Sequence, residues 1–324
     1  MEIDLNFLKI KKFNLHFLVG VLKVKLDVYD VSIIIVNYNT YDLVLQCIES
    51  VVKNTSKILY EIIVVDNNSP NREVEQLNEI YPQVKLILNN ENSGFGIANN
   101  LGNMVAKGKY IFLLNSDTIV LDNSIYYLYD FMKKNLDVGA CGGNLCDAEL
   151  NPATSFTRSM PSIFSDIDYF FYNIFSKLKF GKNLYYCYET LPIRIYGNIS
   201  GADLMIQKTV FDELRGFDEN YFMYYEETDL IFRMREKGYK TYIVPQSKIV
   251  HLEGASESLK EIKLNWTYES KEKYFLKNQS KFELRLSNII FYITVIQRML
   301  IFKLLGKKEK FKYWFSFYKW LSLK

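Results

Sequence analysis

The chain has 324 residues, of which 49% are hydrophobic and 16% aromatic, and its formal net charge is +3. This composition is too apolar for a disordered protein, and the length suits one large α/β domain or two small ones. The chain has only two histidines, which excludes a histidine-rich zinc site. Its four cysteines form no C-x-x-C pair, which predicts reduced thiols in a cytoplasmic protein.

Residues 1–30 are apolar with interspersed lysines, and we assign them only as an N-terminal extension. Glu2 and Asp4 come early, lysines interrupt the apolar stretch, and no A-x-A-like cleavage site follows. The segment is therefore not expected to be a signal peptide.

Strands and helices alternate from residue 31 to residue 145. Short β-branched or apolar runs predict strands at 31–36, 61–66, 84–88, 110–114 and 138–145, and helical spacing predicts helices at 42–52, 71–80, 94–106 and 124–134. Such alternation indicates a doubly wound, mostly parallel sheet. Polar residues follow three of the strands at 37–39, 66–69 and 115–117, which favours a nucleotide crevice at one edge of the sheet.

The chain is less regular between residues 146 and 199. After it we expect a short strand at 200–206, a turn at 216–219, and a helix at 225–237 that Gly238 ends. Two more strands, 241–244 and 248–251, are expected on either side of Pro245.

The stretch from Ile111 to Asp117 is the most informative of these elements. Its apolar run fits a strand buried on both faces, so Asp117 would stand at a carboxyl end. A carboxylate there can hold a hard cation that bridges a diphosphate. The residues alone equally allow Asp117 to turn the chain or to cap the helix near Ser124.

Six motifs in order show a family resemblance. They are SIIIVNYNT from Ser32, IVVDNNS from Ile63, NSGFGIANNLG from Asn92, LLNSDT from Leu113, GADLMI from Gly201, and GFDENYFMYYEETDLIFRMREKG from Gly216, with His251 after them. The chain resembles the family 2 inverting glycosyltransferases of GT-A fold, particularly the rhamnosyltransferase-like branch of bacterial surface-polysaccharide synthesis. The resemblance implies a GT-A catalytic domain at 31–257. It also implies transfer of a sugar, most often L-rhamnose from dTDP-rhamnose, to a glycan or lipid-linked acceptor.

The resemblance also implies a donor site and a divalent metal, Mg²⁺ or Mn²⁺. Asp117 matches the last acid of the family's D-x-D-type element, and His251 resembles its second metal ligand. The first position of that element is Asn115 here, so the donor diphosphate would have to supply ligands to the metal in place of a second carboxylate. Asp66 would contact the nucleotide base. The residues assigned to the donor are Asn37, Asn39, Asp66, Asn68, Gly94, Phe95, Asn99, Asn115, Ser116 and Asp117.

The catalytic base is expected among the acids near the start of the helix at 225–237. The family has Glu-Asp where this chain has Glu226-Glu227, so Glu227 is the expected base, one methylene longer than usual; Asp229 follows on the same helix. Acids are also favoured in a first helical turn by the helix dipole, which would explain any one of them. Asp203 and Asp218 are expected on the acceptor side, although Asp218 could equally form a turn.

Two other function classes compete with an inverting transferase that uses a dTDP- or UDP-sugar. A sugar nucleotidyltransferase would need a glycine-rich loop with a basic residue directly after the first strand, and 37–39 is not one. A catalytically inactive glycan-binding subunit is suggested by Asn115 and Glu227. No nucleic-acid partner is expected.

Residues 258–324 form a basic, aromatic tail with 15 Lys and Arg against 5 Asp and Glu. Its segment 286–305 is about long enough to span a bilayer, but Arg298 and Lys303 lie within it, and Ser287, Thr294 and Arg298 share one helical face. Lysines and aromatics mixed in this way are typical of an interfacial anchor. We therefore expect peripheral attachment to an anionic membrane surface on the cytoplasmic side; the alternative is a helix packed on the protein's own core.

Overall fold

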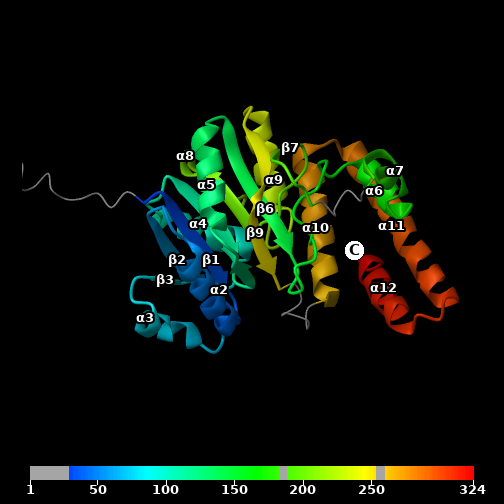
Figure 1. Ribbon diagram of the computed structural model, residues 1–324. Coiled ribbons are helices and arrows are strands. Elements are labelled where there is room, and N and C mark those ends of the chain that lie inside the picture. Colours follow the sequence, from blue (N-terminus) through cyan, green and yellow to red (C-terminus); the bar gives the residue numbers. More distant parts are fainter. Residues whose placement is uncertain (1–28, 182–187, 253–259) are drawn as a thin grey trace, which may run out of the picture.

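The computed structural model describes residues 29–181, 188–252 and 260–324 (Figure 1). The N-terminal extension expected at 1–30 therefore lies outside the described residues, except for Tyr29 and Asp30.

A nine-stranded sheet forms the centre of the described chain, in the order β3-β2-β1-β4-β8-β6-β9-β5, with β7 paired to β9. The strands are β1 (Val31–Asn37), β2 (Tyr60–Asp66), β3 (Lys85–Leu88), β4 (Tyr110–Asn115), β5 (Thr118–Val120), β6 (Val138–Cys146), β7 (Ile193–Ile195), β8 (Asp203–Gln207) and β9 (Lys240–His251). Strands β5, β7 and β8 run against the direction shared by the others. The expected α/β class with a doubly wound, mostly parallel sheet is confirmed.

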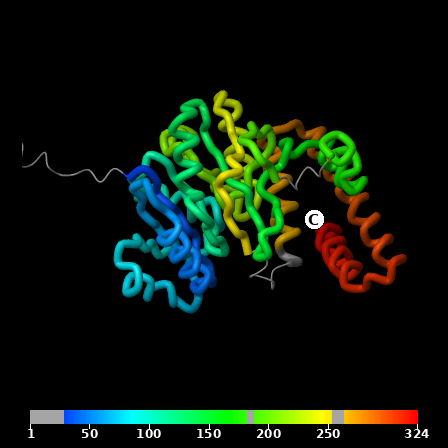
Figure 2. The backbone as a smooth tube through the Cα atoms, viewed as in Figure 1, coloured from blue at the N-terminus to red at the C-terminus, as the bar shows by residue number. Residues whose placement is uncertain are grey.

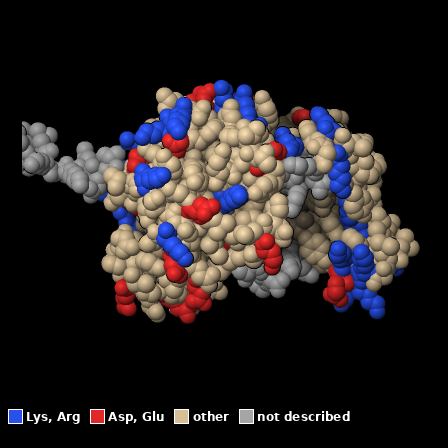
Figure 3. All heavy atoms as spheres, in the orientation of Figure 1, with Lys and Arg blue, Asp and Glu red and all other residues tan. Residues whose placement is uncertain are grey.

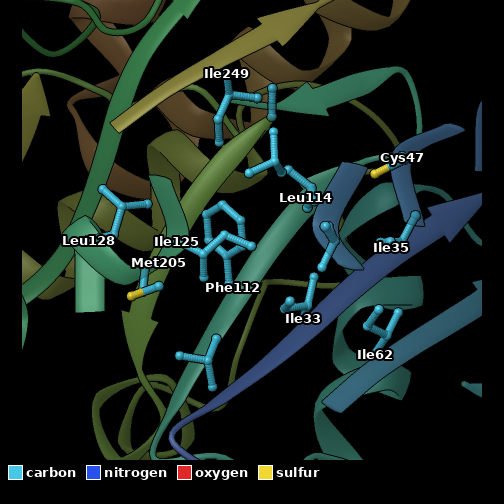
Figure 4. Packing of buried hydrophobic residues seen from close by; sticks show 14 of the residues in the cluster. Ile33, Ile35, Cys47, Ile62, Phe112, Leu114, Ile125, Leu128, Met205 and Ile249 are labelled. Carbon is cyan, nitrogen blue, oxygen red and sulfur yellow. The ribbon is translucent and has the colours of Figure 1, made fainter. Parts of the chain in front are cut away.

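Helices cover both faces of the sheet because its central strands are apolar on both sides. Alternate residues of β1 point to opposite faces, so Ile33 and Ile35 join one core and Ile34 the other. Helices α2 (Tyr41–Asn54) and α5 (Ser124–Lys134) pack on the first face, where Figure 4 shows Cys47 and Leu128 beside the strands. Helices α4 (Phe95–Val105), α8 (Lys208–Glu213) and α9 (Glu226–Glu236) cover the second.

Five further helices gather beyond the β9 side of the sheet (Figures 1 and 2). They are α6 (Ile163–Phe170), α7 (Ile174–Phe180), α10 (Lys260–Asn278), α11 (Lys281–Leu304) and α12 (Lys308–Leu321). Helix α11 packs against α6, α10 and α12, and it begins in a capping box formed by Ser280 and Glu283. The expected helical C-terminal extension is confirmed, and α6 and α7, from the middle of the chain, join it.

The prediction of a single helix at 71–80 is wrong. Arg72 adopts a left-handed conformation with φ 50°, and only a 3₁₀ turn (Glu73–Gln76) and the four-residue α3 (Leu77–Ile80) follow. Few apolar contacts hold this segment, since Val74 and Leu77 alone are buried within it.

The two strands expected on either side of Pro245 are one continuous strand, β9. The β6–β9 register shifts between Gly142 and Asn144, which places a bulge opposite Pro245. A Cβ added at Gly143 would lie 2.5 Å from Ser247 Oγ, so this close approach requires glycine.

The expected strand at 200–206 begins later, at Asp203, because residues 201 and 202 lie in the preceding turn. The region 146–199, for which no elements were predicted, contains α6, α7 and β7. The apolar side chains of α7 are largely exposed, so the inward-facing apolar stripe that marks a core helix is missing there.

Candidate active site

Three polar side chains hold the ends of β1 and β2 together. The parallel register pairs Asn37 with Asp66, and Asn37 Nδ2 donates to Asp66 Oδ1 at 2.7 Å. Ser69 donates its hydroxyl to the same oxygen at 2.6 Å and its backbone N–H to Oδ2 at 2.9 Å. The buried Asp66 carboxylate therefore fixes the loop after β2 and keeps this edge of the sheet polar.

The exposed Asn39 and Asn68 lie on the rim beside this cluster. Both have positive φ, 58° and 64°, which asparagine tolerates better than most residues. The Asn39 N–H donates to Ser69 Oγ at 2.8 Å, and Thr40 Oγ1 lies 3.0 Å from Ser116 Oγ. These contacts join the loops after β1, β2 and β4 into one polar edge.

The loop before α4 is attached to the loop before α9 at Gly94. Gly94 has φ +85°, and a Cβ added there would lie 2.1 Å from the carbonyl oxygen of Phe222. The Phe95 N–H donates to that carbonyl at 3.0 Å. Ala98 and Asn99 are buried, and Asn99 Nδ2 donates to Phe95 O. The wall expected for the donor pocket is therefore shared with the segment that leads to the acids of α9.

Asp117 and His251 lie side by side, as a shared metal site requires. Thr118 pairs with His251 in the β5–β9 ladder, and His251 Nε2 lies 3.3 Å from Asp117 Oδ1. Asn115 Nδ2 is 3.5 Å from the same imidazole nitrogen. The described residues contain no group of three or more His, Cys, Asp or Glu side chains that could hold a metal. The pair fits a partly open site, in which Asp117 and His251 would hold a divalent cation and a substrate diphosphate and water would supply its remaining ligands.

The two glutamates at the start of α9 are neighbours in the chain, and Glu226 is buried whereas Glu227 is half-buried. Burial and the neighbouring Glu227 charge raise the pKa of Glu226 well above its usual value. Burial also raises the pKa of Glu227, but backbone N–H groups and Asn198 Nδ2, 3.3 Å from Glu227 Oε1, favour its charged form. Each glutamate has one buried oxygen without a hydrogen-bond partner. More hydrogen bonds favour the charged form at Glu227 than at Glu226, so Glu227 is the member of the pair better suited to act as a base.

This arrangement predicts how activity depends on pH. A base must be deprotonated to act, so activity should fall as pH drops through the raised pKa of Glu227. Replacing Asn198 by Ala removes a donor that favours the carboxylate, so the acidic limb of the kcat/KM profile should move to higher pH. The pH profiles of Asn198→Ala and wild type check this. An unmoved acidic limb would contradict the role of Asn198.

A cavity of about 500 Å³ lies beside Glu227, between α6, α9, α10 and α11. Its lining combines five aromatic residues with several side chains that bear hydroxyl groups. The ion pair between Lys271 Nζ and Asp166 Oδ1, 2.6 Å apart, also lies in the lining. Such a mixture suits a polar ligand with apolar faces. The main aromatic and apolar lining residues are Tyr169, Tyr224, Tyr225, Leu264, Tyr268 and Phe291.

The other acids expected in the site lie outside this cavity. Asp203 is buried at the start of β8, where its carboxylate accepts a backbone N–H of β6 at 2.7 Å and burial raises its pKa well above the usual value. Asp218 forms an ion pair with Lys277 at 2.6 Å. Asp229 is fully buried and is paired with both Arg233 and Lys277. These contacts give Asp218 and Asp229 structural partners, and we leave both out of the proposed catalytic step.

Sequence reasoning missed three residues of this region. Asn198 contacts Glu227, whereas Lys271 and Asp166 meet across the cavity from α10 and α6. No local pattern marks them, because Asp166 and Lys271 are separated by 105 residues in the chain.

Comparisons with known proteins show which family the chain resembles. Residues 32–197 match the family model described as Glycosyl transferase family 2. The chain is 27% identical over 202 residues to N-acetylglucosaminyl-diphospho-decaprenol L-rhamnosyltransferase of Mycobacterium tuberculosis, a match that spans 59% of this chain and 66% of that protein. It is 36% identical over 110 residues to poly(ribitol-phosphate) beta-glucosyltransferase of Bacillus spizizenii, over 32% of this chain and 17% of that protein.

A solved structure shares the fold. The crystal structure of GalNAc-T7 with UDP, GalNAc and Mn²⁺ matches with a TM-score of 0.53 and 18% identity, over 69% of this chain and 43% of that chain. The expected GT-A type of fold is thereby confirmed.

Proposed function

The chain belongs to glycosyl transferase family 2, and we propose that it is an inverting enzyme that moves a sugar from a nucleotide donor to a glycan or lipid-linked acceptor. The donor we propose is dTDP-L-rhamnose, because a relative 27% identical is named an L-rhamnosyltransferase. The proposed setting is cell-surface polysaccharide synthesis. One observation carries the proposal: Glu227 lines the cavity of about 500 Å³ and has a buried carboxylate oxygen without a partner.

In the proposed reaction Glu227 is the general base. It removes the proton of an acceptor hydroxyl while that oxygen attacks the anomeric carbon from the face opposite the nucleoside diphosphate. The bond to the acceptor oxygen forms as the bond to the diphosphate oxygen breaks, so one displacement inverts the anomeric configuration. No nucleophile on the enzyme is required. Burial and the charge of Glu227 raise the pKa of Glu226, which favours Glu227 as the charged member of the pair.

The donor is proposed to lie along the polar edge formed by β1, β2 and β4. Asn37 and Asp66 would face the nucleoside end, and Ser116 and Asp117 the diphosphate. Asp117 and His251 would hold Mg²⁺ or Mn²⁺. When bound, the cation supplies positive charge that stabilises the leaving diphosphate.

A turnover screen tests the proposed activity. Purified full-length protein is incubated with dTDP- and UDP-sugars and Mn²⁺ or Mg²⁺, and release of the nucleoside diphosphate is measured. We expect dTDP-L-rhamnose to be consumed in preference to the others. Failure to consume or bind any nucleotide sugar would support an inactive subunit, and formation of a nucleotide sugar from a sugar phosphate would support a nucleotidyltransferase.

Helix α11 supports the proposed attachment to a membrane, because its polar side chains face the protein and its apolar side chains face outward. Ser287, Thr294 and Arg298, the polar stripe, are buried against the rest of the protein. The opposite side presents exposed apolar side chains at spacings of seven and four residues: Phe282, Ile289, Ile293, Leu300 and Leu304. Among the described helices α11 is also long and apolar enough to cross a membrane, by length and composition. A helix that is polar inside and apolar outside suits a lipid environment better than water.

Basic residues surround the lower end of this apolar surface. Figure 3 shows Lys and Arg gathered over the end of α11 and the start of α12, where Lys303, Lys307, Lys308, Lys310 and Lys312 are exposed. Each lysine near an anionic leaflet contributes on the order of 1 kcal/mol. We propose that this surface lies on the cytoplasmic face of the membrane.

Replacing Leu300 and Leu304 together by Glu should weaken binding to anionic liposomes at least about tenfold. The two leucines are 56% and 86% exposed, and full burial of a Leu side chain is worth about 1.5–3 kcal/mol. Sedimentation with phosphatidylglycerol vesicles measures the effect. Leu136→Glu, at a site 78% exposed after α5, is the matched control and should bind like wild type. Equal sedimentation of the three proteins would show that α11 does not contact the membrane.

A further inference from the structure

A second cavity, of about 380 Å³, lies between the α6–α7 connection and helices α11 and α12. Its aromatic walls surround two cationic side chains, and no carboxylate is among the residues that line it. The lining residues that carry the argument are Tyr169, Tyr172, Asn173, Lys177, Arg298 and Trp314.

Arg298 is the central residue of this cavity. It is only 4% exposed, and its Nη2 donates to the carbonyl oxygen of Tyr169 at 2.7 Å. Its guanidinium carbon lies 3.3 Å from the ring centroid of Tyr172. The Nη1 group is buried and has no hydrogen-bond partner, and Arg298 makes no ion pair with any described residue. A buried charge without a counter-ion is costly, so a bound anion would stabilise this arrangement.

The nearby carboxylates of α6 do not line this cavity, although Asp168 Oδ2 is buried without a hydrogen-bond partner. Asp166 accepts from Lys271 and from the Ser287 hydroxyl, each at 2.6 Å. Asp168 accepts the backbone N–H groups at the start of α7, from Phe175 at 2.9 Å and from residue 176 at 3.2 Å. The exposed Lys177 adds a second positive charge to the cavity, and no described carboxylate pairs with it. The cavity is therefore cationic on balance.

The surroundings of the cavity indicate a lipid rather than a free anion. Ile174, Phe175 and Leu178 of α7 are exposed beside it, and the outward apolar side of α11 continues from the helix that carries Arg298. Tyr169 lines both this cavity and the cavity of Glu227. A phosphoryl group held at Arg298 would thus have an apolar surface on one side and the site of the proposed base on the other.

We propose that this cavity binds the phosphoryl group of a lipid-linked acceptor, through Arg298 and Lys177. The guanidinium offers its unpartnered Nη1 to phosphate oxygens, and such charge-assisted hydrogen bonds are among the strong ones. The lipid chain would lie along the exposed apolar residues of α7 and α11. This proposal rests on the proposed function, because it names the chemistry that presents the acceptor sugar to Glu227.

Geranyl diphosphate, a water-soluble prenyl diphosphate, is the probe. We expect calorimetry to show that it binds full-length protein, that geraniol does not, and that inorganic pyrophosphate binds more weakly. Arg298→Gln should weaken binding at least tenfold. Arg285→Gln, which removes an exposed charge from the same helix, should leave binding within about twofold.

If Arg298→Gln does not fold, Lys177→Gln tests the same cavity. It should also weaken binding, whereas Lys179→Gln, on the same helix but outside the lining, should not. Equal binding to wild type and to both cavity variants would overturn the proposal. Pyrophosphate that binds as tightly as geranyl diphosphate would overturn its lipid part. Phosphatidylglycerol vesicles that displace the probe at equal headgroup concentration would overturn the assignment to the acceptor, because a membrane headgroup would then be the ligand.

The outcomes also separate this proposal from the proposed function. Wild-type protein that binds geranyl diphosphate but consumes no nucleotide sugar would support the phosphoryl site and contradict the transferase. Protein that consumes a nucleotide sugar but does not bind the probe would support the transferase and contradict the phosphoryl site.

Discussion

Replacing Glu227 by Gln should lower the rate of sugar transfer by about 10²–10⁴-fold, the usual loss when a general base is removed. Donor affinity should change little, because a base acts on the acceptor hydroxyl in the transition state and not on the bound nucleotide. Single-turnover transfer and equilibrium binding of the nucleotide sugar measure the two effects separately.

Glu226→Gln is the matched control for this change. Burial and the charge of Glu227 raise the pKa of Glu226 well above its usual value, and glutamine resembles a protonated glutamate in shape and lacks charge. We therefore expect Glu226→Gln to retain most of the transfer rate. If Glu226→Gln is the more damaging substitution, the base is Glu226 and the assignment moves by one residue.

Replacing Asp117 by Asn should abolish metal-dependent turnover. Asp117 and His251 are the one carboxylate and the one imidazole in contact at the end of β4, and Asn115 beside them carries no charge that could substitute. Turnover measured against Mn²⁺ concentration checks the prediction, with Asp130→Asn on α5 as a control that should behave like wild type. Turnover within about tenfold of wild type, a loss of only ~1.4 kcal/mol, would remove Asp117 from the proposed ligands.

The parts of the fold that could be predicted from the sequence are those with local signals. The strands β1, β2 and β4 are continuous apolar runs that end in polar residues, and α5 has the bounds Ser124–Lys134 that its spacing predicted. Because parallel strands end at the same edge of a sheet, Asn37, Asp66 and Asp117 could also be assigned to one crevice before the structure was known.

The remainder depends on contacts that leave no local pattern. The acids of α9 are close in sequence, but the helix turns Glu227 toward the cavity and places Asp229 against Arg233 and Lys277. In the sequence, the polar stripe of α11 argues against a membrane span. The structure shows that Ser287 in this stripe binds Asp166 of α6, so the stripe is explained by packing.

The contacts of Asp166 also set an order of assembly. Its partners Lys271 and Ser287 come 105 and 121 residues later in the chain, so neither contact can form until the ribosome has synthesised those residues. The β1–β2 and β1–β4 ladders need no residue beyond 115. Closing a longer loop costs more entropy, and distant contacts form slowly. The polar edge at the ends of β1, β2 and β4 can therefore begin to form while the chain is still being made, and the wall that α6 and α10 give to the cavity beside Glu227 is completed later.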